Sequence, residues 1–172
     1  MRLFLALLTL GSPLAQAEQF FHVELVFFRY THAPLDNGQP APDDWAQGTE
    51  PLAASNLQAP RLVQKTLGLT AEKGYTILLH KAWRQELSEI PVNIAVHGTN
   101  PRLELFPVQG KLRLNVTKQI DADASFWVNR FDTQGRLIGT ESLIQKMRLL
   151  HSGELYYLDH GSLGLLIQVT RL

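Results

Sequence analysis

The last part of the chain carries the densest group of ionisable side chains in the sequence. Asp159 and His160 are adjacent, and His151, Glu154 and Tyr156 precede them by a few residues. A carboxylate beside an imidazole can act as a general acid–base pair. Adjacent residues of a turn seldom converge on one substrate, so we favour a structural interpretation. In that interpretation Asp159 caps backbone amides of a tight turn, and His160 packs on a neighbouring tyrosine.

A second candidate site is the run Trp83-Arg84-Gln85, which joins an aromatic plane to polar groups at the end of an expected strand. Such a set can stack on a sugar ring and hydrogen-bond its hydroxyl groups. The alternative, which we favour, is a tryptophan at the edge of the core with Arg84 in a surface ion pair. Successive strand residues point to opposite faces, so only one of Trp83 and Arg84 can face the core.

Several classes of chemistry are excluded by residues or patterns that the sequence lacks. The chain has no cysteine, which excludes disulfides, thiolate metal sites and cysteine nucleophiles. Its six histidines show no zinc-motif spacing, so we expect no metal site. Nucleotide-binding glycine patterns and serine-hydrolase motifs are missing, so we expect no cofactor and no enzyme. Equal numbers of basic and acidic residues, 16 of each, argue against nucleic-acid binding.

Hydrophobic patterning indicates the elements that would position these candidates. Apolar and polar residues alternate over 20–30, which predicts a strand. A long irregular segment with four prolines follows over 31–55. An apolar repeat at helical spacing predicts one main helix over 57–73, with Pro60 in its first turn and Gly74 just beyond its end.

The rest of the chain predicts strands joined by short connections. The expected strands are 75–85, 92–97, a short one begun by Leu103 and Leu105, 108–117, 124–131, 142–150, 155–158 and 163–169. The run 142–150 also fits a helix, but flanking glycines favour a strand. Turns are expected at 121–123 and 132–135. Short connections favour antiparallel neighbours, so the predicted class is α+β: a curved, mainly antiparallel β-sheet with one main helix packed on it.

The first 17 residues have the features of a secretory signal peptide. Arg2 supplies a positive charge, residues 3–10 form a short apolar run, and Ala15-Gln16-Ala17 is a small-x-small cleavage site. The apolar run is too short for a membrane anchor. We therefore expect a signal peptide over 1–17 and a single domain over 18–172, without a membrane span after cleavage. The natural compartment is the bacterial periplasm.

Several segments, taken in order, form a recognisable pattern. An apolar strand over 21–28 follows the signal peptide, L-L-H-x-x-W-R-Q occupies 78–85, and S-G-E-L-x-Y-L-D-H occupies 152–160. This pattern resembles the CsiV family of periplasmic peptidoglycan-binding proteins of gammaproteobacteria. The resemblance implies a non-catalytic protein that binds peptidoglycan and partners LpoA, an outer-membrane lipoprotein that activates a class A penicillin-binding protein. It thereby implies a role in supporting cell-wall synthesis.

The residues themselves leave two other functions open. One is a periplasmic adaptor or chaperone-like protein whose only ligand is a protein. The other is a cell-wall hydrolase that uses Glu154, Asp159 or His160. We take seven residues as the candidate binding or structural motif: Trp83, Arg84, Gln85, Glu154, Tyr156, Asp159 and His160.

The cleavage site predicts a mature chain that begins at Glu18. Intact-mass analysis of protein released by osmotic shock should show a chain lacking residues 1–17. Detergent should not be needed, because no cysteine is present to carry a lipid. Recovery of the chain with Met1 in that fraction would contradict the prediction.

Overall fold

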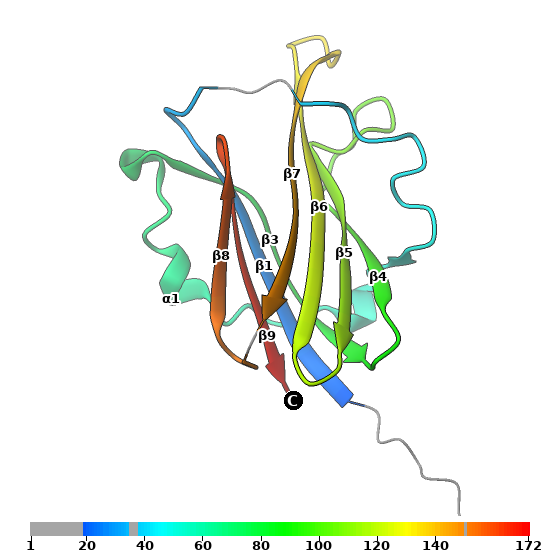
Figure 1. Cartoon of the computed structure of the whole chain (residues 1–172). Helices are drawn as coiled ribbons and strands as arrows, with labels where there is room; N and C mark the ends of the chain where they lie inside the picture. Colours follow the sequence, from blue (N-terminus) through cyan, green and yellow to red (C-terminus); the bar gives the residue numbers. More distant parts are fainter. Residues whose placement is uncertain (1–18, 35–37, 150) are drawn as a thin grey trace, which may run out of the picture.

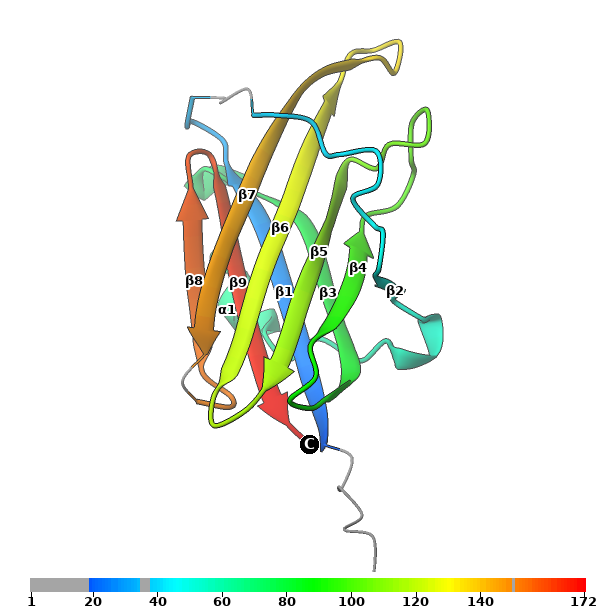
Figure 2. The ribbon, with the colours of Figure 1, turned by 45° about the vertical axis from the view of Figure 1, so that its right-hand side comes forward.

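Two β-sheets lie face to face with a hydrophobic core between them (Figures 1 and 2). The computed structural model describes residues 19–34, 38–149 and 151–172, and the predicted signal peptide lies outside them. Sheet A has the strand order β3-β1-β9-β8, and sheet B has the order β2-β4-β5-β6-β7. All neighbouring strands are antiparallel except β2 and β4.

Most strands coincide with the alternating runs of the sequence, although β6 and β7 begin before the runs expected at 124–131 and 142–150. The strands of sheet A are β1 (Gln19–Tyr30), β3 (Tyr75–Leu87), β8 (Leu155–His160) and β9 (Leu163–Arg171). Those of sheet B are β2 (Glu50–Pro51), β4 (Val92–His97), β5 (Val108–Val116), β6 (Ile120–Phe131) and β7 (Leu137–Leu149). The helical pieces are η1 (Ala54–Asn56), α1 (Val63–Thr66) and η2 (Ala71–Lys73). The strand expected within 142–150 is confirmed by β7 up to Leu149.

The expectation of an α+β fold with one main helix is wrong. In the described part of the chain no helix exceeds four residues, and the strands form two sheets rather than one. The expected helix over 57–73 is an irregular segment that contains only α1 and η2. Of its apolar repeat, Leu62 is buried whereas Leu57, Val63 and Leu67 stay exposed. The repeat at helical spacing is therefore not the buried stripe of a helix.

Hydrogen bonds to sheet A explain why this segment does not coil into a helix. The Gln58 amide donates to the Ala82 carbonyl at 2.8 Å, along the free edge of β3. The backbone amides of Arg61 and Leu62 donate to the Glu24 carboxylate at 2.8 and 3.0 Å. Pro60 also disfavours a helical conformation at the residue before it. The amides of Gln58, Arg61 and Leu62 are thus satisfied by sheet A instead of by a helix of their own.

Strand β1 is the centre of this arrangement because both of its faces are buried. Residues 21–28 are all buried, and the odd-numbered ones point into the core between the sheets. There the Phe27 ring lies 5.3 Å from the Phe126 ring of β6, centroid to centroid. Phe126 needs Gly110 beside it, since a Cβ at that position would lie 2.5 Å from its ring. The even-numbered residues face outward. His22 and Glu24 contact the segment over 57–73, whereas the Phe28 ring lies against the rings of Tyr30, Tyr75 and Tyr157.

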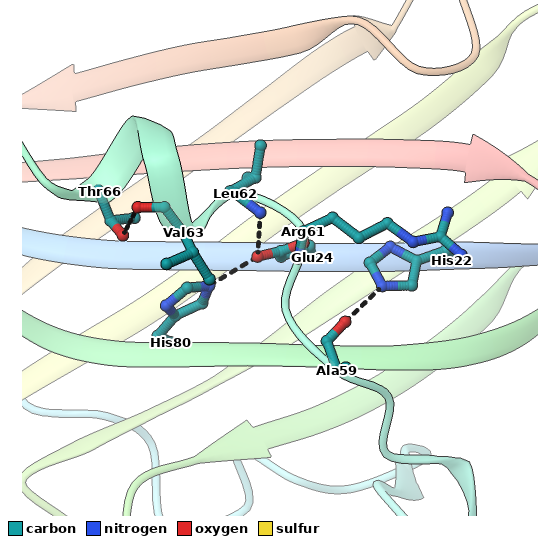
Figure 3. Close-up of polar contacts among 8 residues, drawn as sticks. All are labelled: His22, Glu24, Ala59, Arg61, Leu62, Val63, Thr66 and His80. Carbon is teal, nitrogen blue, oxygen red and sulfur yellow. Dashed lines mark hydrogen bonds and ion pairs between the residues drawn. The ribbon is translucent and has the colours of Figure 1, made fainter.

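The outward face of β1 carries a buried carboxylate, shown in Figure 3. Glu24 is fully buried, and His80 of β3 donates to it from Nε2 at 2.6 Å. Together with the amides of Arg61 and Leu62, this gives the carboxylate three donors. Nearby, the ring of His22 hydrogen-bonds the Ala59 carbonyl at 3.3 Å. The segment over 57–73 is therefore fastened to sheet A through polar groups.

The protonation of Glu24 is set by competing effects. Burial raises the pKa of the Glu24 carboxyl. This effect is more than offset by the hydrogen bond from His80, by those from the Arg61 and Leu62 amides, and by the charge of His80. The pKa of Glu24 in the folded protein is consequently below its usual value of 4.5. Folding therefore favours the ionised carboxylate.

A second buried carboxylate joins the two sheets at one end of the fold. Glu141 of β7 is 2% exposed and accepts hydrogen bonds from Arg29 of β1 and from Ser162 in the β8–β9 turn. Arg130 of β6 lies 4.0 Å from the same carboxylate. An ion pair thus links β1 to sheet B, and a hydrogen bond links the β8–β9 turn to it.

Two smaller expectations from the sequence are also wrong. Leu103 and Leu105 do not begin a strand, because Leu103 and Glu104 have positive φ values and form a tight turn closed by Arg102 and Leu105. Residues 121–123 lie inside β6 rather than in a turn. Their two aspartates alternate with the buried Ala122 and point outward, where arginines of β5 and β7 pair with them. The turn expected at 132–135 is confirmed.

We expect Glu24→Gln to destabilise the protein by about 3 kcal/mol near neutral pH, since it removes one partner of a buried, hydrogen-bonded ion pair. A folded-state pKa below the unfolded value means that the ionised carboxylate stabilises the fold above about pH 4.5. This contribution is lost as the pH falls through the lower, folded-state pKa. The unfolding free energy of the wild type should therefore fall on acidification more steeply than that of Glu24→Gln, as measured by urea titration.

Glu89→Gln is the matched control, because Glu89 is exposed and makes no ion pair within the described residues. It should unfold like the wild type at every pH. Parallel pH profiles for wild type and Glu24→Gln would show that Glu24 does not anchor the segment over 57–73.

Candidate functional site

Trp83 lies in the hydrophobic core and not on a binding surface. Its side chain is 0% exposed and packs with Leu79 and Leu87 from the same face of β3. Its indole Nε1 donates to the Gln85 side-chain oxygen at 3.1 Å. The interpretation of Trp83 as a core residue is confirmed, and its polar edge orients Gln85 at the end of the strand.

Arg84 points to the opposite face of β3 and is exposed. Its guanidinium carbon lies 3.6 Å from the centroid of the Phe20 ring of β1, a close cation–π contact. No described residue forms an ion pair with it, so the expected surface ion pair is replaced by stacking on an aromatic ring. The stacked guanidinium keeps donors free in its plane for a ligand.

Arg84 and Gln85 line a groove of about 580 Å³, which we call the seam groove. One wall comes from sheet A, with Phe20, Glu86 and Ser88 beside Arg84 and Gln85. The other wall comes from the edge of sheet B, formed by the β2 region and by the start of β4. It contributes Glu50, Asn56, Ile90, Pro91 and Asn93. The seam groove therefore follows the junction where β3 meets the edge of sheet B, a junction that Figure 2 shows from the side of sheet B.

The chemistry of the seam groove suits a neutral polar ligand with some apolar surface. Two carboxylates, Glu50 and Glu86, face one guanidinium, so there is no excess of positive charge. The side-chain amides of Asn56, Gln85 and Asn93 can both donate and accept hydrogen bonds. Ile90, 79% exposed, supplies an apolar rim. Sugar rings, which carry hydroxyl groups around apolar faces, match this combination.

The closing motif is divided between the two ends of β8. At its start, the Tyr156 hydroxyl donates to the Glu154 carboxylate at 2.7 Å, and His151 lies 3.3 Å from the same group. The hydrogen bond from Tyr156, and after it that from His151, hold the pKa of Glu154 below its usual value. His151 and Glu154 are exposed and lie in the turn between β7 and β8, whereas Tyr156 is half-buried within β8.

Asp159 and His160 lie at the far end of β8 and are both exposed. A strand rises about 3.3 Å per residue, so roughly 17 Å separates the backbone of Glu154 from that of Asp159. Within the described residues no hydrogen bond joins the Asp159 carboxylate to a backbone amide of the turn, so the expected cap is absent. Burial, a hydrogen bond with Tyr30 and the nearby Asp159 carboxylate raise the pKa of Tyr157. The seven residues selected from the sequence thus form three separate groups. Arg84 and Gln85 line the seam groove, whereas His160 borders a small hollow of about 30 Å³.

Several groove residues were not selected by sequence reasoning. Phe20 belongs to the run that predicts β1, and nothing local indicates that its ring supports an arginine 64 positions later. Asn56 and Asn93 come from the segments that build the opposite wall. Their convergence depends on how the two sheets are packed, which no local pattern reports.

Comparison with known protein families identifies the chain. A family described as "Peptidoglycan-binding protein, CsiV" matches residues 48–172. The chain belongs to the CsiV family. The match to the CsiV family covers β2 to β9. It therefore includes every residue that lines the seam groove except Phe20 of β1. Neither a curated protein nor a solved structure gives a significant match.

Two further observations concern the described residues of this CsiV-family chain. No three histidine, aspartate or glutamate side chains among them gather closely enough to hold a metal ion. No helix in the described ranges is long and apolar enough to cross a membrane.

Proposed function

We propose that the protein is a non-catalytic periplasmic module that binds peptidoglycan through the seam groove and supports cell-wall synthesis. Membership of a peptidoglycan-binding family is the observation that carries this proposal. The seam groove is the proposed location, because Arg84 and Gln85 of the motif over 78–85 line it.

The seam groove offers the contacts that a glycan strand needs. The Arg84 guanidinium, flat on Phe20, presents N–H donors to hydroxyl and carbonyl oxygens. Gln85 is held by Trp83, so less conformational freedom is lost when it hydrogen-bonds a ligand. Ile90 and Pro91 give apolar surface against which a sugar face can lie.

The absence of catalysis is part of the proposal. Glu154 is separated from Asp159 and His160 by the length of β8, and all three side chains are exposed to solvent. A hydrolase needs its acid and its base or nucleophile on either side of one bond. The protein should therefore bind sacculi without decreasing their turbidity or releasing soluble fragments. Release of muropeptides by the wild type but not by Glu154→Gln would favour a hydrolase instead.

We also propose an LpoA-like outer-membrane lipoprotein as protein partner. This part rests on the resemblance of the sequence to the family. A chain that binds the wall and such a lipoprotein together would bring the activator of a class A penicillin-binding protein to its substrate. Co-purification after periplasmic crosslinking tests the partner separately from wall binding.

Arg84→Ala should weaken co-sedimentation with purified sacculi by roughly 5- to 30-fold, the usual effect of losing an arginine anchor worth about 1–2 kcal/mol. The fold should be preserved, because the side chain is exposed and its contact with the Phe20 ring lies outside the hydrophobic core. The dissociation constant from a sedimentation titration is the measurement, with thermal unfolding as the check on folding.

Arg102→Ala is a matched control for this substitution. Arg102 also lies over an aromatic ring, that of Phe131, at 5.8 Å, and lines none of the grooves described here. It should bind sacculi like the wild type. Equal loss in both arginine variants, or no loss in Arg84→Ala, would remove the seam groove as the binding site.

A further inference from the structure

The outward face of sheet B carries a patterned set of charged side chains. Cross-strand pairing places Asn93, Arg113, Asp123 and Lys146 in one row across β4 to β7. Lys111 lies in the adjacent row with Ser125 and the exposed Ile144. Asp121 and Arg148 form the next row on the other side. We call the set Lys111, Arg113, Asp121, Asp123, Ile144, Lys146 and Arg148 the sheet B face.

Only part of the outward surface of sheet B is open. Towards the other end of the sheet, Gln109, Trp127 and Thr140 are buried. There residues 38–49 cross the sheet, and the Gly38 amide donates to the Thr140 carbonyl at 2.7 Å (Figure 2). Trp45 of the same segment is half-buried. The chain thus covers one end of this surface itself and leaves the sheet B face uncovered.

The uncovered part is hollowed rather than flat. Two adjoining hollows of about 380 and 570 Å³ lie on it, and both are lined by Arg113, Asp123 and Lys146. The smaller hollow also contains Lys111 and Ile144, and the larger contains Arg148. A ligand lying in them would contact side chains from several neighbouring strands.

The charge of the sheet B face is not balanced internally. Arg113 lies 3.4 Å from Asp123, and Arg148 lies 3.1 Å from Asp121, so each arginine has a carboxylate partner. Lys111 and Lys146 have no ion-pair partner among the described residues. The face therefore has an excess of two positive charges on a chain whose overall formal charge is zero. Such a local excess attracts anions.

The two binding surfaces are continuous. Pro91 lines both the seam groove and the larger hollow, and Asn93 lines both the seam groove and the smaller hollow. A ligand in the seam groove could therefore extend across the start of β4 onto the sheet B face. That face differs from the groove in charge, since the groove has more carboxylates than cations.

We propose that the sheet B face binds the carboxylates of peptidoglycan stem peptides, with Lys111 and Lys146 as the principal cations. The inference rests on the proposed function and assigns a second part of the ligand to a second surface. The seam groove holds the uncharged glycan, and the peptide branches reach the lysines. Ile144, 62% exposed beside Lys111 and Lys146, offers an apolar contact for the aliphatic part of a stem.

The test uses the double variant Lys111→Gln/Lys146→Gln in the full mature chain. Its affinity for intact sacculi should fall about 10-fold, because two contacts between charged groups are lost. Since salt screens such contacts, the affinity of the double variant should also depend less on salt concentration than that of the wild type. Its affinity for glycan strands from which the stems have been removed by an amidase should match that of the wild type. Arg84→Ala should differ from the double variant, because it should lose affinity for the stem-free strands as well as for intact sacculi.

The control double variant is Lys65→Gln/Lys73→Gln, which makes the same change of charge on the segment over 57–73. Both lysines are exposed and lack ion pairs within the described ranges. This control should bind sacculi like the wild type. An equal loss in both double variants would show a general charge effect and overturn the inference.

Two other outcomes separate this inference from the proposed function. If the wild type binds sacculi and Lys111→Gln/Lys146→Gln binds them equally well, stem recognition by the sheet B face is wrong while wall binding stands. If the wild type binds neither sacculi nor stem-free strands, the proposed function and this inference both fail. Loss of affinity for stem-free strands in the double lysine variant would also overturn the assignment to stem carboxylates.

Discussion

The burial of β1 on both faces is the constraint on which the rest of the structure depends. Its odd-numbered side chains meet sheet B, and its even-numbered side chains must be covered from outside. One of the latter is Glu24, and a buried carboxylate is tolerated only where donors surround it. The segment over 57–73 supplies two backbone amides, and His80 supplies a third donor. The conformation of that segment follows from this requirement.

The same constraint shapes the candidate site. The segment over 57–73 begins along the free edge of β3, where Gln58 pairs with Ala82. It leaves the end of β3 uncovered, and there Arg84 stacks on Phe20 and faces the edge of sheet B. Trp83, one residue earlier, fills the core and orients Gln85. Successive residues of one strand thus fill the core and line the seam groove.

A branched polymer is the ligand to which the two surfaces are best matched. The seam groove is polar without an excess of positive charge, whereas the sheet B face carries two lysines without partners. Peptidoglycan combines an uncharged glycan chain with peptide branches that carry carboxylates. Two adjoining surfaces of different charge distinguish these parts better than one uniform basic patch, which would attract any anion.

The sequence by itself determined the local structure of most of the chain. Alternation of apolar and polar residues has the period of a strand, so the runs that form β1 and β3 to β9 could be located. The same alternation assigned Trp83 and Arg84 to opposite faces of β3. Tertiary structure decided what covers each face. It divided the strands into two sheets, replaced the expected helix over 57–73 with a segment bound to Glu24, and separated Glu154 from Asp159 along β8. Side-chain alternation is a property of neighbouring residues, whereas strand order, grooves and the partners of a buried charge depend on residues far apart in the chain.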